Sequence, residues 1–235
     1  MRLLETGAHD AFFNMALDEA LMDSIEPVLR MYSWSPPAVS VGYFQKVDDE
    51  VDENACGRLG VDIIRRQTGG GAVFHDRELT YSVVLKKYPQ NILESYKWIC
   101  DAIIDGLSTL GIRAEFSPLN DIVVSGKKIS GCAQTRKKGV LLQHGTILLG
   151  VDVEKMFSIL KVPSEKMRGK LMSDVRARVA SLGVSFNDAS EAIKKGVEIK
   201  MGAELVPGEP TDEETSKAIK LAREKYRSKG WLYRI

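Results

Sequence analysis

The sequence has few cysteines and histidines and none of the short motifs in which these residues bind zinc. Its three cysteines, Cys56, Cys100 and Cys132, are an odd number and lack CxxC spacing. Free cysteines of this kind suit a reducing compartment, so we expect a cytoplasmic protein. The three histidines lie far apart in the sequence, which excludes a local zinc motif.

Long apolar runs and an excess of one charge are also missing. No apolar run reaches the roughly 18 residues needed to span a bilayer, and the N-terminus lacks the apolar block of a signal peptide. The 33 basic and 32 acidic residues leave a net charge of +1, which argues against a chain-wide nucleic-acid-binding surface. We therefore expect neither membrane nor nucleic acid as a partner.

What is present is the composition of an ordinary globular protein. The chain has 235 residues, of which 44% are hydrophobic and 28% charged, enough to bury a sizeable core. Residues 11–22 carry an i, i+3, i+4 apolar stripe behind Asp10, which is suited to cap a helix. A second helix is expected at 92–110, closed by Gly111. Ser125-Gly126 is suited to a hairpin turn.

The remaining pattern separates strands from helices along the chain. β-like runs precede residue 152, and mainly helical patterns follow it. The runs of β character are 28–34, 38–44, 61–66, 79–86 and 139–151. We predict one α+β domain over residues 1–235, in which residues 152–235 are a candidate for a small helical subdomain.

Residues 65–76, RRQTGGGAVFHD, place two arginines before three glycines. Glycine lets backbone amides approach a phosphate or carboxylate closely, and the arginines offer charge-assisted hydrogen bonds to the same anion. A bulge or tight strand connection with solvated arginines explains the pattern equally well. No GK[ST] follows, so the stretch is not a P-loop.

Residues 125–146, SGKKISGCAQTRKKGVLLQHGT, are a second candidate region. Strand alternation sends Lys127 and Lys128 to opposite faces, so one of them can meet an anion while the other faces solvent. From periodicity alone, a solvated lysine remains the simpler interpretation of each. His144 is more typical of a satisfied core histidine, and Cys132 of a small buried residue. Residues 136–138 suggest a solvated turn. The second interpretation is a docking surface for an acidic partner.

Six motifs in order and spacing resemble the lipoate–protein ligase family, within the biotin and lipoate ligase superfamily. They are FNMALDEAL (13–21), VGYFQ (41–45), RRQTGGGAVFHD (65–76), ND (120–121), GKKISGCAQ (126–134) and HGTILL (144–149). The resemblance implies a mixed, mainly antiparallel sheet flanked by helices, like the class II synthetase and biotin ligase catalytic domain. It also implies a ligase that activates lipoate with ATP and Mg²⁺ to lipoyl-AMP.

The resemblance further implies that lipoyl-AMP then acylates a lysine of a lipoyl carrier domain. The carrier would be a 2-oxoacid dehydrogenase E2 or a glycine-cleavage H protein. Lys128 aligns with the family's essential lysine and is expected to be catalytic, because it can offset charge on the carboxyl and phosphoryl oxygens.

Other positions are carried over from the same family motifs. Expected nucleotide-binding residues are Arg66, Gly69, Gly70, Gly71, Ala72, Val73, Phe74, Asn120 and Asp121, with Asp121 also a candidate Mg²⁺ ligand. Expected substrate-binding residues are Gly42, Tyr43, His75 and His144, of which Gly42 and Tyr43 would line an apolar tunnel.

The chain departs from the family pattern in two respects. Family ligases that work alone carry a C-terminal accessory domain, which this sequence lacks, so a separately encoded accessory chain is expected to support adenylation. Second, residues 75–84 and 133–145 resemble the octanoyltransferase branch, whose members use no ATP and pass the acyl group through a cysteine. Residues 111–124, where that cysteine would lie, contain none.

Three functions therefore stay open from the sequence. The ATP-dependent ligase is the leading prediction, because nucleophilic catalysis needs its nucleophile. An ATP-independent octanoyl or lipoyl transferase between carrier proteins is the alternative, and it would require Cys132 as a relocated nucleophile. A non-catalytic module that binds a lipoyl domain or a nucleotide is the third.

Overall fold

The computed structural model describes residues 1–161 and 165–235. Its elements in chain order are β1 (Arg2–His9), α1 (Ala11–Leu21), β2 (Val28–Trp34), β3 (Ala38–Val41), α2 (Val47–Glu50), α3 (Glu53–Leu59), β4 (Asp62–Arg65), β5 (Val73–His75), β6 (Glu78–Leu85), α4 (Ile92–Ser108), β7 (Ala114–Ser117), β8 (Asp121–Val124), β9 (Lys127–Lys137), β10 (Val140–Leu148), α5 (Val153–Ile159), α6 (Glu165–Arg178), α7 (Phe186–Met201), β11 (Val206–Gly208), α8 (Asp212–Leu221), the π-helical turn η1 (Ala222–Tyr226) and α9 (Lys229–Leu232).

Eight strands form one sheet in the order β11-β1-β2-β6-β10-β9-β8-β7. The pairs β11–β1 and β1–β2 are parallel, and the other neighbours are antiparallel. A smaller sheet has the order β4-β3-β5. The predicted mixed, mainly antiparallel sheet is thus confirmed.

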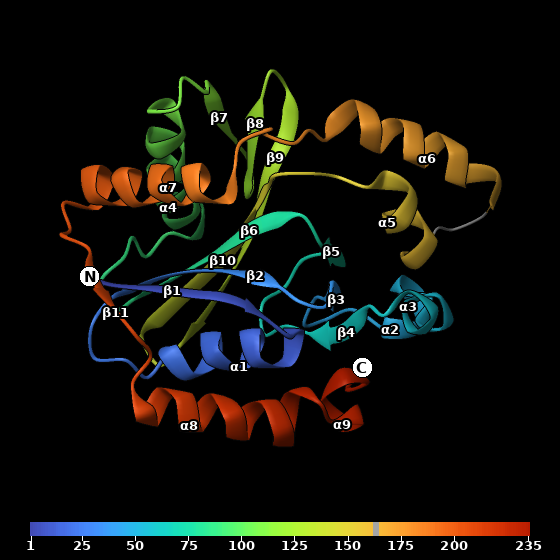
Figure 1. Cartoon of the computed structure of the whole chain (residues 1–235), viewed down its shortest axis with the longest axis horizontal. Helices are drawn as coiled ribbons and strands as arrows, with labels where there is room; N and C mark the ends of the chain where they lie inside the picture. The colour runs from blue at the N-terminus through green and yellow to red at the C-terminus, as the bar shows by residue number, and fades with distance from the viewer. Residues whose placement is uncertain (162–164) are drawn as a thin grey trace.

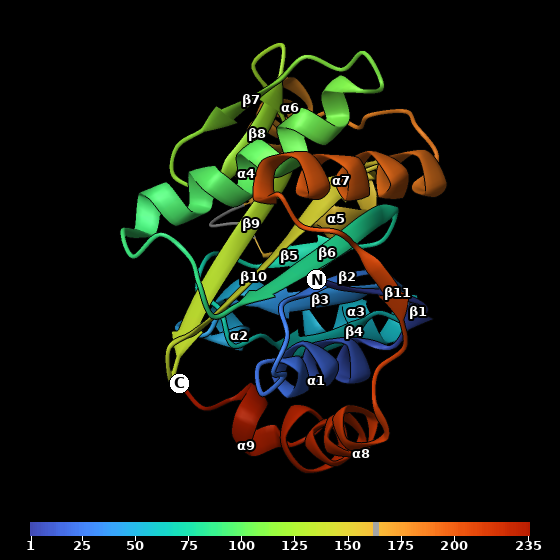
Figure 2. The same cartoon turned by 90° about the vertical axis from the view of Figure 1, so that its left-hand side faces the viewer.

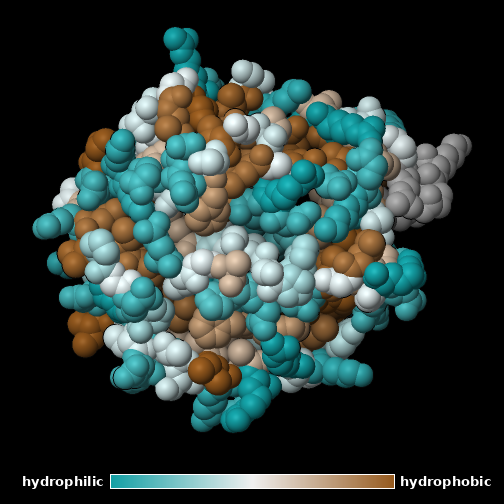
Figure 3. Space-filling view, viewed as in Figure 1, coloured by the Kyte–Doolittle hydropathy of each residue, from teal (hydrophilic) through white to brown (hydrophobic). Residues whose placement is uncertain are grey.

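Helices cover both faces of the large sheet, as Figures 1 and 2 show: α4 and α7 lie on one face, α1 and α8 on the other. One apolar cluster fills the space under α4 and α7, a second lies under α1 and α8, and a third packs around the small sheet. Outside, polar and apolar residues are interspersed over the face in Figure 3. Among the described residues, no helix has the length and apolar character needed to cross a bilayer.

Local signals in the sequence account for several boundaries. The side chain of Asp10 accepts a hydrogen bond from the backbone N–H of Phe13 at 2.8 Å, which confirms the predicted cap of α1. Ser125 and Gly126 both have positive φ angles, 49° and 74°, and join β8 to β9 in the predicted two-residue turn. The helical pattern after residue 210 is broken, because α8 passes into η1 and then α9.

Alternation along the central strands sorts side chains between the two faces. On β6 and β10, Ser82 pairs with His144, whereas Tyr81 pairs with Gly145. Tyr81 belongs to the cluster under α4 and α7, so the even-numbered residues point to the opposite face. That opposite face carries the candidate site.

Candidate functional site

A cavity of about 370 Å³ lies where the large sheet meets the small sheet, the glycine stretch and α6. Apolar side chains from several elements line much of it, and Lys128 and His144 line it as well. The apolar residues include Met15, Val73, Leu148, Met156 and Val175. A mostly apolar hollow with a few polar groups is the usual form of a small-molecule site.

Arg66 organises the glycine stretch from inside the protein. Its Nη2 donates to the carbonyl oxygens of Gly69 and Gly71, both at 2.7 Å. Nη1 donates to Ser40 O at 2.8 Å and Ser40 Oγ at 3.1 Å, and Nε donates to Thr68 Oγ1 at 3.1 Å. All five N–H groups of the guanidinium are therefore used within the protein.

The charge of Arg66 is buried with these bonds. The residue is only 5% exposed, and burial lowers its pKa to about 10, so it stays protonated at neutral pH. The glycine carbonyls point toward this charge. Arg66 therefore shapes the loop and has no N–H group left to bind a ligand.

Arg65 performs a similar task on the other side of the loop. Its Nη1 donates to the carbonyl oxygens of Gly42, Tyr43 and Gln45, at 2.8, 3.1 and 2.7 Å. Its Nη2 donates to Leu232 O at 2.6 Å, which ties the loop after β3 to α9. Both arginines expected at an anion site thus hold backbone carbonyls.

Gly42 lies against the glycine stretch rather than in the cavity wall. A Cβ at this position would fall 2.0 Å from the carbonyl oxygen of Gly70, so only glycine allows the two loops to approach so closely. The ring of Tyr43 contacts Trp231 and lies under the guanidinium of Arg234, with the ring centroid 3.9 Å from the Cζ atom of Arg234. The expected tunnel residues therefore support the loop from behind.

Lys128 is one of the cationic residues that line the cavity, together with Arg66 and Arg77. Its Nζ lies 2.7 Å from Asp121 Oδ1, an ion pair whose alignment is not that of a hydrogen bond, and its side chain is 40% exposed. A β-bulge between Ile122 and Val123 shifts the register, so that Val123 pairs with Lys128 but Asp121 pairs with Gly131. The lysine side chain crosses the space above Gly131. Lys128 therefore holds a partly exposed charge at the cavity, paired with Asp121.

Asn120 and Asp121 are both committed to contacts within the protein. The Asn120 amide donates to the carbonyl oxygen of Cys132, and the Cys132 N–H donates to Asn120 O at 3.0 Å. Asp121 meets Lys128. Within the described part of the chain, no group of three or more His, Cys, Asp or Glu residues is placed to hold a metal ion.

His144 belongs to a buried hydrogen-bonded chain beneath the cavity. Its Nδ1 lies 3.2 Å from Asp18 Oδ2, and its Nε2 lies 2.7 Å from Thr68 Oγ1. Burial lowers the pKa of His144, although Asp18 opposes the shift. Burial raises the pKa of Asp18, but His144 and Arg30 outweigh it, so this pKa lies below its ordinary value. A neutral His144 with both ring nitrogens paired suits a positioning role.

His75 is held in the same manner at the edge of the small sheet. Its Nδ1 lies 2.7 Å from Glu78 Oε1, and its Nε2 lies 2.8 Å from Ser40 Oγ. Trp34 stacks on the ring with centroids 4.1 Å apart and donates to Thr80 Oγ1 at 2.7 Å. Sequence reasoning missed Trp34 and Thr80, although both stand in β-like runs whose alternation could have placed them on this face.

The structure brings most of the predicted site residues to the cavity wall. Those that line it are Arg66, Gly70, Gly71, Ala72, Val73, Phe74, His75, Asn120, Lys128 and His144. Gly42, Tyr43, Gly69 and Asp121 are not among the lining residues. The basic run at 136–138 is partly engaged, since Arg136 donates to Gln90 O and Lys137 to Gln67 Oε1, both at 2.6 Å.

The large sheet thus carries a site in which a glycine loop folds around buried arginines and a lysine lies beside a mostly apolar cavity. The sequence model of the lipoyl protein ligase A/B catalytic domain matches residues 10–197, so the chain belongs to that family of lipoylation proteins.

Relatives that are 39% and 40% identical to the chain carry a more specific name than the family does. The chain is 39% identical to the octanoyltransferase LipM of Geobacillus kaustophilus (strain HTA426) and 40% identical to that of Kyrpidia tusciae (strain DSM 2912 / NBRC 15312 / T2). Each alignment covers 99% of this chain and 98% of the relative. Among solved structures, it matches with a TM-score of 0.92 an archaeal lipoylation system of Thermoplasma acidophilum, described as a bi-partite lipoate protein ligase and its E2 lipoyl domain. The identity is 33%, with 99% of this chain and 95% of the other covered.

These relatives correct the leading prediction. The expected ATP-dependent lipoate ligase, with ATP and Mg²⁺ as cofactors and lipoate as the acid to be activated, is wrong, because the full-length curated relatives are octanoyltransferases. A transferase moves an acyl group that is already activated. The buried bonds of Arg66 give a physical reason, since the arginine expected to contact nucleotide is spent on the glycine loop.

Proposed function

We propose that this protein is an ATP-independent acyltransferase that moves an octanoyl-type group from a carrier-bound thioester to a lysine of a lipoyl carrier domain. The octanoyltransferase name of relatives aligned over 99% of the chain is the observation that carries this proposal. The apolar cavity beside Lys128 supports it, because it offers a place for the chain and a charge for the reacting carbonyl.

The cavity suits an acyl chain of medium length. Its volume of about 370 Å³ falls within the range of small-ligand sites. Each buried methylene contributes about 0.8 kcal/mol, so an eight-carbon chain gains on the order of 5 kcal/mol from burial. Binding energy of this size holds the acyl group while its carbonyl end stays near Lys128.

Lys128 is the residue to which we assign the chemistry. Attack on a thioester carbonyl places negative charge on the carbonyl oxygen, and a nearby ammonium stabilises that charge. Asp121 limits where the ammonium rests, and Gly131 leaves room for its stem. His144, His75 and Arg66 act by holding the walls rather than by contacting the reacting atoms.

The partners follow from this reaction. The acceptor is a carrier domain with an exposed lysine, either an E2 lipoyl domain or a glycine-cleavage H protein. An accessory chain was expected only to support adenylation, and the transferase reaction does not call for it. We also infer a cytoplasmic location from the three free cysteines, Cys56, Cys100 and Cys132.

The test is a transfer reaction from which ATP has been removed. Purified protein is mixed with octanoyl-acyl carrier protein and an E2 lipoyl domain, in the presence of apyrase and EDTA. We expect the intact mass of the lipoyl domain to rise by one octanoyl group, and an acceptor whose target lysine is arginine to stay unmodified. Product that forms only from free octanoate with Mg-ATP would refute the proposal.

A further inference from the structure

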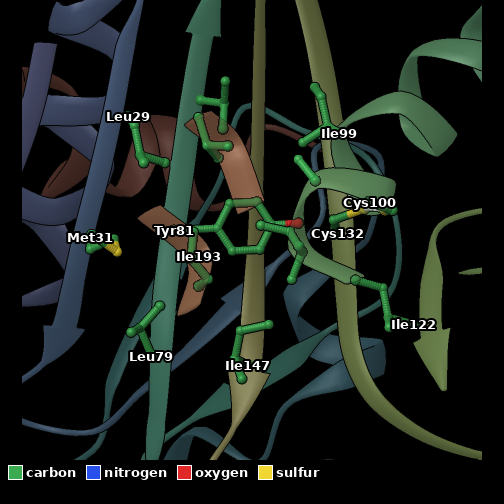
Figure 4. Close-up of a cluster of buried hydrophobic side chains, with 14 of the residues drawn as sticks. Leu29, Met31, Leu79, Tyr81, Ile99, Cys100, Ile122, Cys132, Ile147 and Ile193 are labelled. Carbon is green, nitrogen blue, oxygen red and sulfur yellow. Dashed lines mark hydrogen bonds between the residues drawn. The ribbon is translucent and has the colours of Figure 1, made fainter. Parts of the chain in front are cut away.

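Arg77 lies between β5 and β6, is exposed, and lines the cavity. On β6, Leu79 and Tyr81 belong to the cluster under α4 and α7, and Figure 4 shows both side chains in that cluster. Residue 77 would point the same way if the alternation of β6 continued. The chain bends there instead, with the Glu78 N–H donating to Asp76 O at 3.2 Å. Because of this bend, Arg77 lies at the cavity wall.

The backbone at the end of β10 holds the stem of Arg77. The carbonyl oxygen of Arg77 accepts hydrogen bonds from the N–H groups of Leu149 and Gly150, at 3.1 and 2.9 Å. A Cβ on Gly150 would lie 3.3 Å from Cβ and Nε of Arg77 and 3.4 Å from its Cδ, so the side chain runs close over this glycine. The stem is therefore fixed in place, while the residue as a whole stays exposed.

The charge of Arg77 is available to a ligand. Its N–H groups form no hydrogen bond or ion pair with any residue that the structure describes. The acidic residues described at the cavity wall have other partners or are buried. Asp76 pairs with Lys155 at 3.4 Å, and Asp152 caps α5 by accepting the Lys155 N–H at 2.9 Å. Glu78 is buried.

A free guanidinium at a substrate cavity suits an anionic group such as a phosphate. Its five N–H donors match the paired oxygens of that group in a planar fork. Arg66 already uses its N–H groups on the glycine loop and its neighbours, and Lys128 is paired with Asp121. Of the three cations described at the cavity, Arg77 is therefore the one left to bind an anionic group of the substrate.

Backbone hydrogen bonds indicate how far Arg77 lies from Lys128. Three of them link the segments between the two residues: the N–H of Leu149 donates to Arg77 O at 3.1 Å, that of Leu182 to Leu148 O at 2.9 Å, and that of Ala180 to Lys128 O at 2.9 Å. Segments joined in this way lie about 4.8 Å apart, so three spacings separate the two backbones by roughly 14 Å.

We propose that Arg77 binds the phosphodiester of the phosphopantetheine arm on which a donor carrier protein bears its acyl thioester. The inference rests on the proposed acyltransferase function and names a contact for the donor of that reaction. About thirteen bonds join the phosphorus of this arm to its sulfur. At the reach of an extended peptide, roughly 3.5 Å for three bonds, they span about 15 Å. With its phosphate on Arg77, the arm therefore brings the thioester to Lys128.

The experiment compares two small donors that differ only in the phosphate. Octanoyl-4′-phosphopantetheine and octanoyl-pantetheine are each supplied with an E2 lipoyl domain, beside octanoyl-acyl carrier protein, and kcat and KM are measured for each donor. Arg77→Met is compared with wild-type protein and with Arg58→Met. The control removes an exposed arginine of α3 that is not among the residues lining the cavity.

We expect wild-type protein and Arg58→Met to prefer the phosphorylated donor in kcat/KM by about ten- to a hundredfold, the effect of a hydrogen bond to a charged group. In Arg77→Met we expect this preference to disappear and the KM for octanoyl-acyl carrier protein to rise by a similar factor. A role of Arg77 in folding alone would lower kcat/KM for both small donors and leave their ratio unchanged.

The results that would overturn the inference are distinguishable from failure of the proposed function. An unchanged donor preference in Arg77→Met would overturn it, and so would a preference that is absent from wild-type protein. Inhibition by inorganic phosphate that disappears in Arg77→Met, with the donor preference unchanged, would assign Arg77 to a free anion. If neither small donor is used, the KM for octanoyl-acyl carrier protein decides: a rise with kcat kept supports the contact, and no change overturns it. If wild-type protein transfers nothing from octanoyl-acyl carrier protein, the proposed function itself fails, and the inference with it.

Discussion

Gly131 leaves open the space that the Lys128 side chain occupies. A Cβ at residue 131 would lie 2.8 Å from both Cε and Nζ of Lys128, closer than side chains tolerate. The two residues are brought together by the bulge opposite β8, which pairs Gly131 with Asp121. The position of the Lys128 ammonium thus depends on a glycine three residues away.

Gly131→Ala is predicted to separate activity from stability. The obstructed atoms are the flexible end of a lysine, so the side chain moves aside and the fold is kept. We expect octanoyl transfer to fall about tenfold or more because the charge is displaced, with a melting temperature close to wild type. Unchanged transfer would show that the resting position of Lys128 is irrelevant to the reaction.

Lys128→Met is predicted to reduce transfer by about a hundred- to a thousandfold, the usual effect of losing a donor to a developing oxyanion. Lys127→Met is the matched control, because Lys127 is exposed and precedes Lys128 in the same strand. The rate of amide formation is measured for both variants beside their circular dichroism spectra. Equal activity of the two variants would remove Lys128 from the mechanism.

Gly42→Ala is predicted to force the loop after β3 away from the glycine stretch. The added Cβ would meet Gly70 O at 2.0 Å, and backbone cannot yield as a side chain does. We expect a loss of about 1–3 kcal/mol in the free energy of unfolding, with a raised KM for the acyl donor. Gly69→Ala, whose Cβ meets nothing within 4 Å, serves as control. A wild-type free energy of unfolding in Gly42→Ala would contradict the packing described here.

His144 is predicted to make stability depend on pH. Its folded pKa lies below the unfolded value of about 6.5, so the unfolded chain binds the proton first as pH falls. The contribution of His144 to the free energy of unfolding is complete above about pH 6.5. It is lost as pH falls toward the lowered folded pKa, by up to about 1.4 kcal/mol per pH unit. The free energy of unfolding is measured with urea at several pH values between 5 and 7. Its change with pH should be smaller for His144→Gln than for wild-type protein. An unaltered slope would mean that His144 does not titrate in this way.

Local signals made much of the fold predictable. The Asp10 cap, the Ser125-Gly126 turn and the strand alternation each depend on residues close in sequence, and each is confirmed. The hydrogen-bond partners of Arg65 and Arg66 were not predictable from the sequence. They are backbone carbonyl groups of the loop after β3, the glycine loop and α9. The arginines and glycines of this stretch suggested an anion-binding site, whereas in the folded protein the two arginines bind backbone carbonyl groups.

The faces of β9 illustrate the same limit. Alternation predicted that Lys127 and Lys128 would diverge but not which one would enter the site. The bulge between Ile122 and Val123 decides this, and nothing in the sequence marks it. Burial of Cys132, by contrast, follows its default behaviour as a small apolar residue and is confirmed.

The most direct test of the account is the rate of octanoyl-amide formation on an E2 lipoyl domain, from octanoyl-acyl carrier protein, with and without Mg-ATP. We predict equal rates under the two conditions for wild-type protein, and rates lower by about a hundredfold or more under both for Lys128→Met. A rate that appears only when Mg-ATP is supplied would contradict the account.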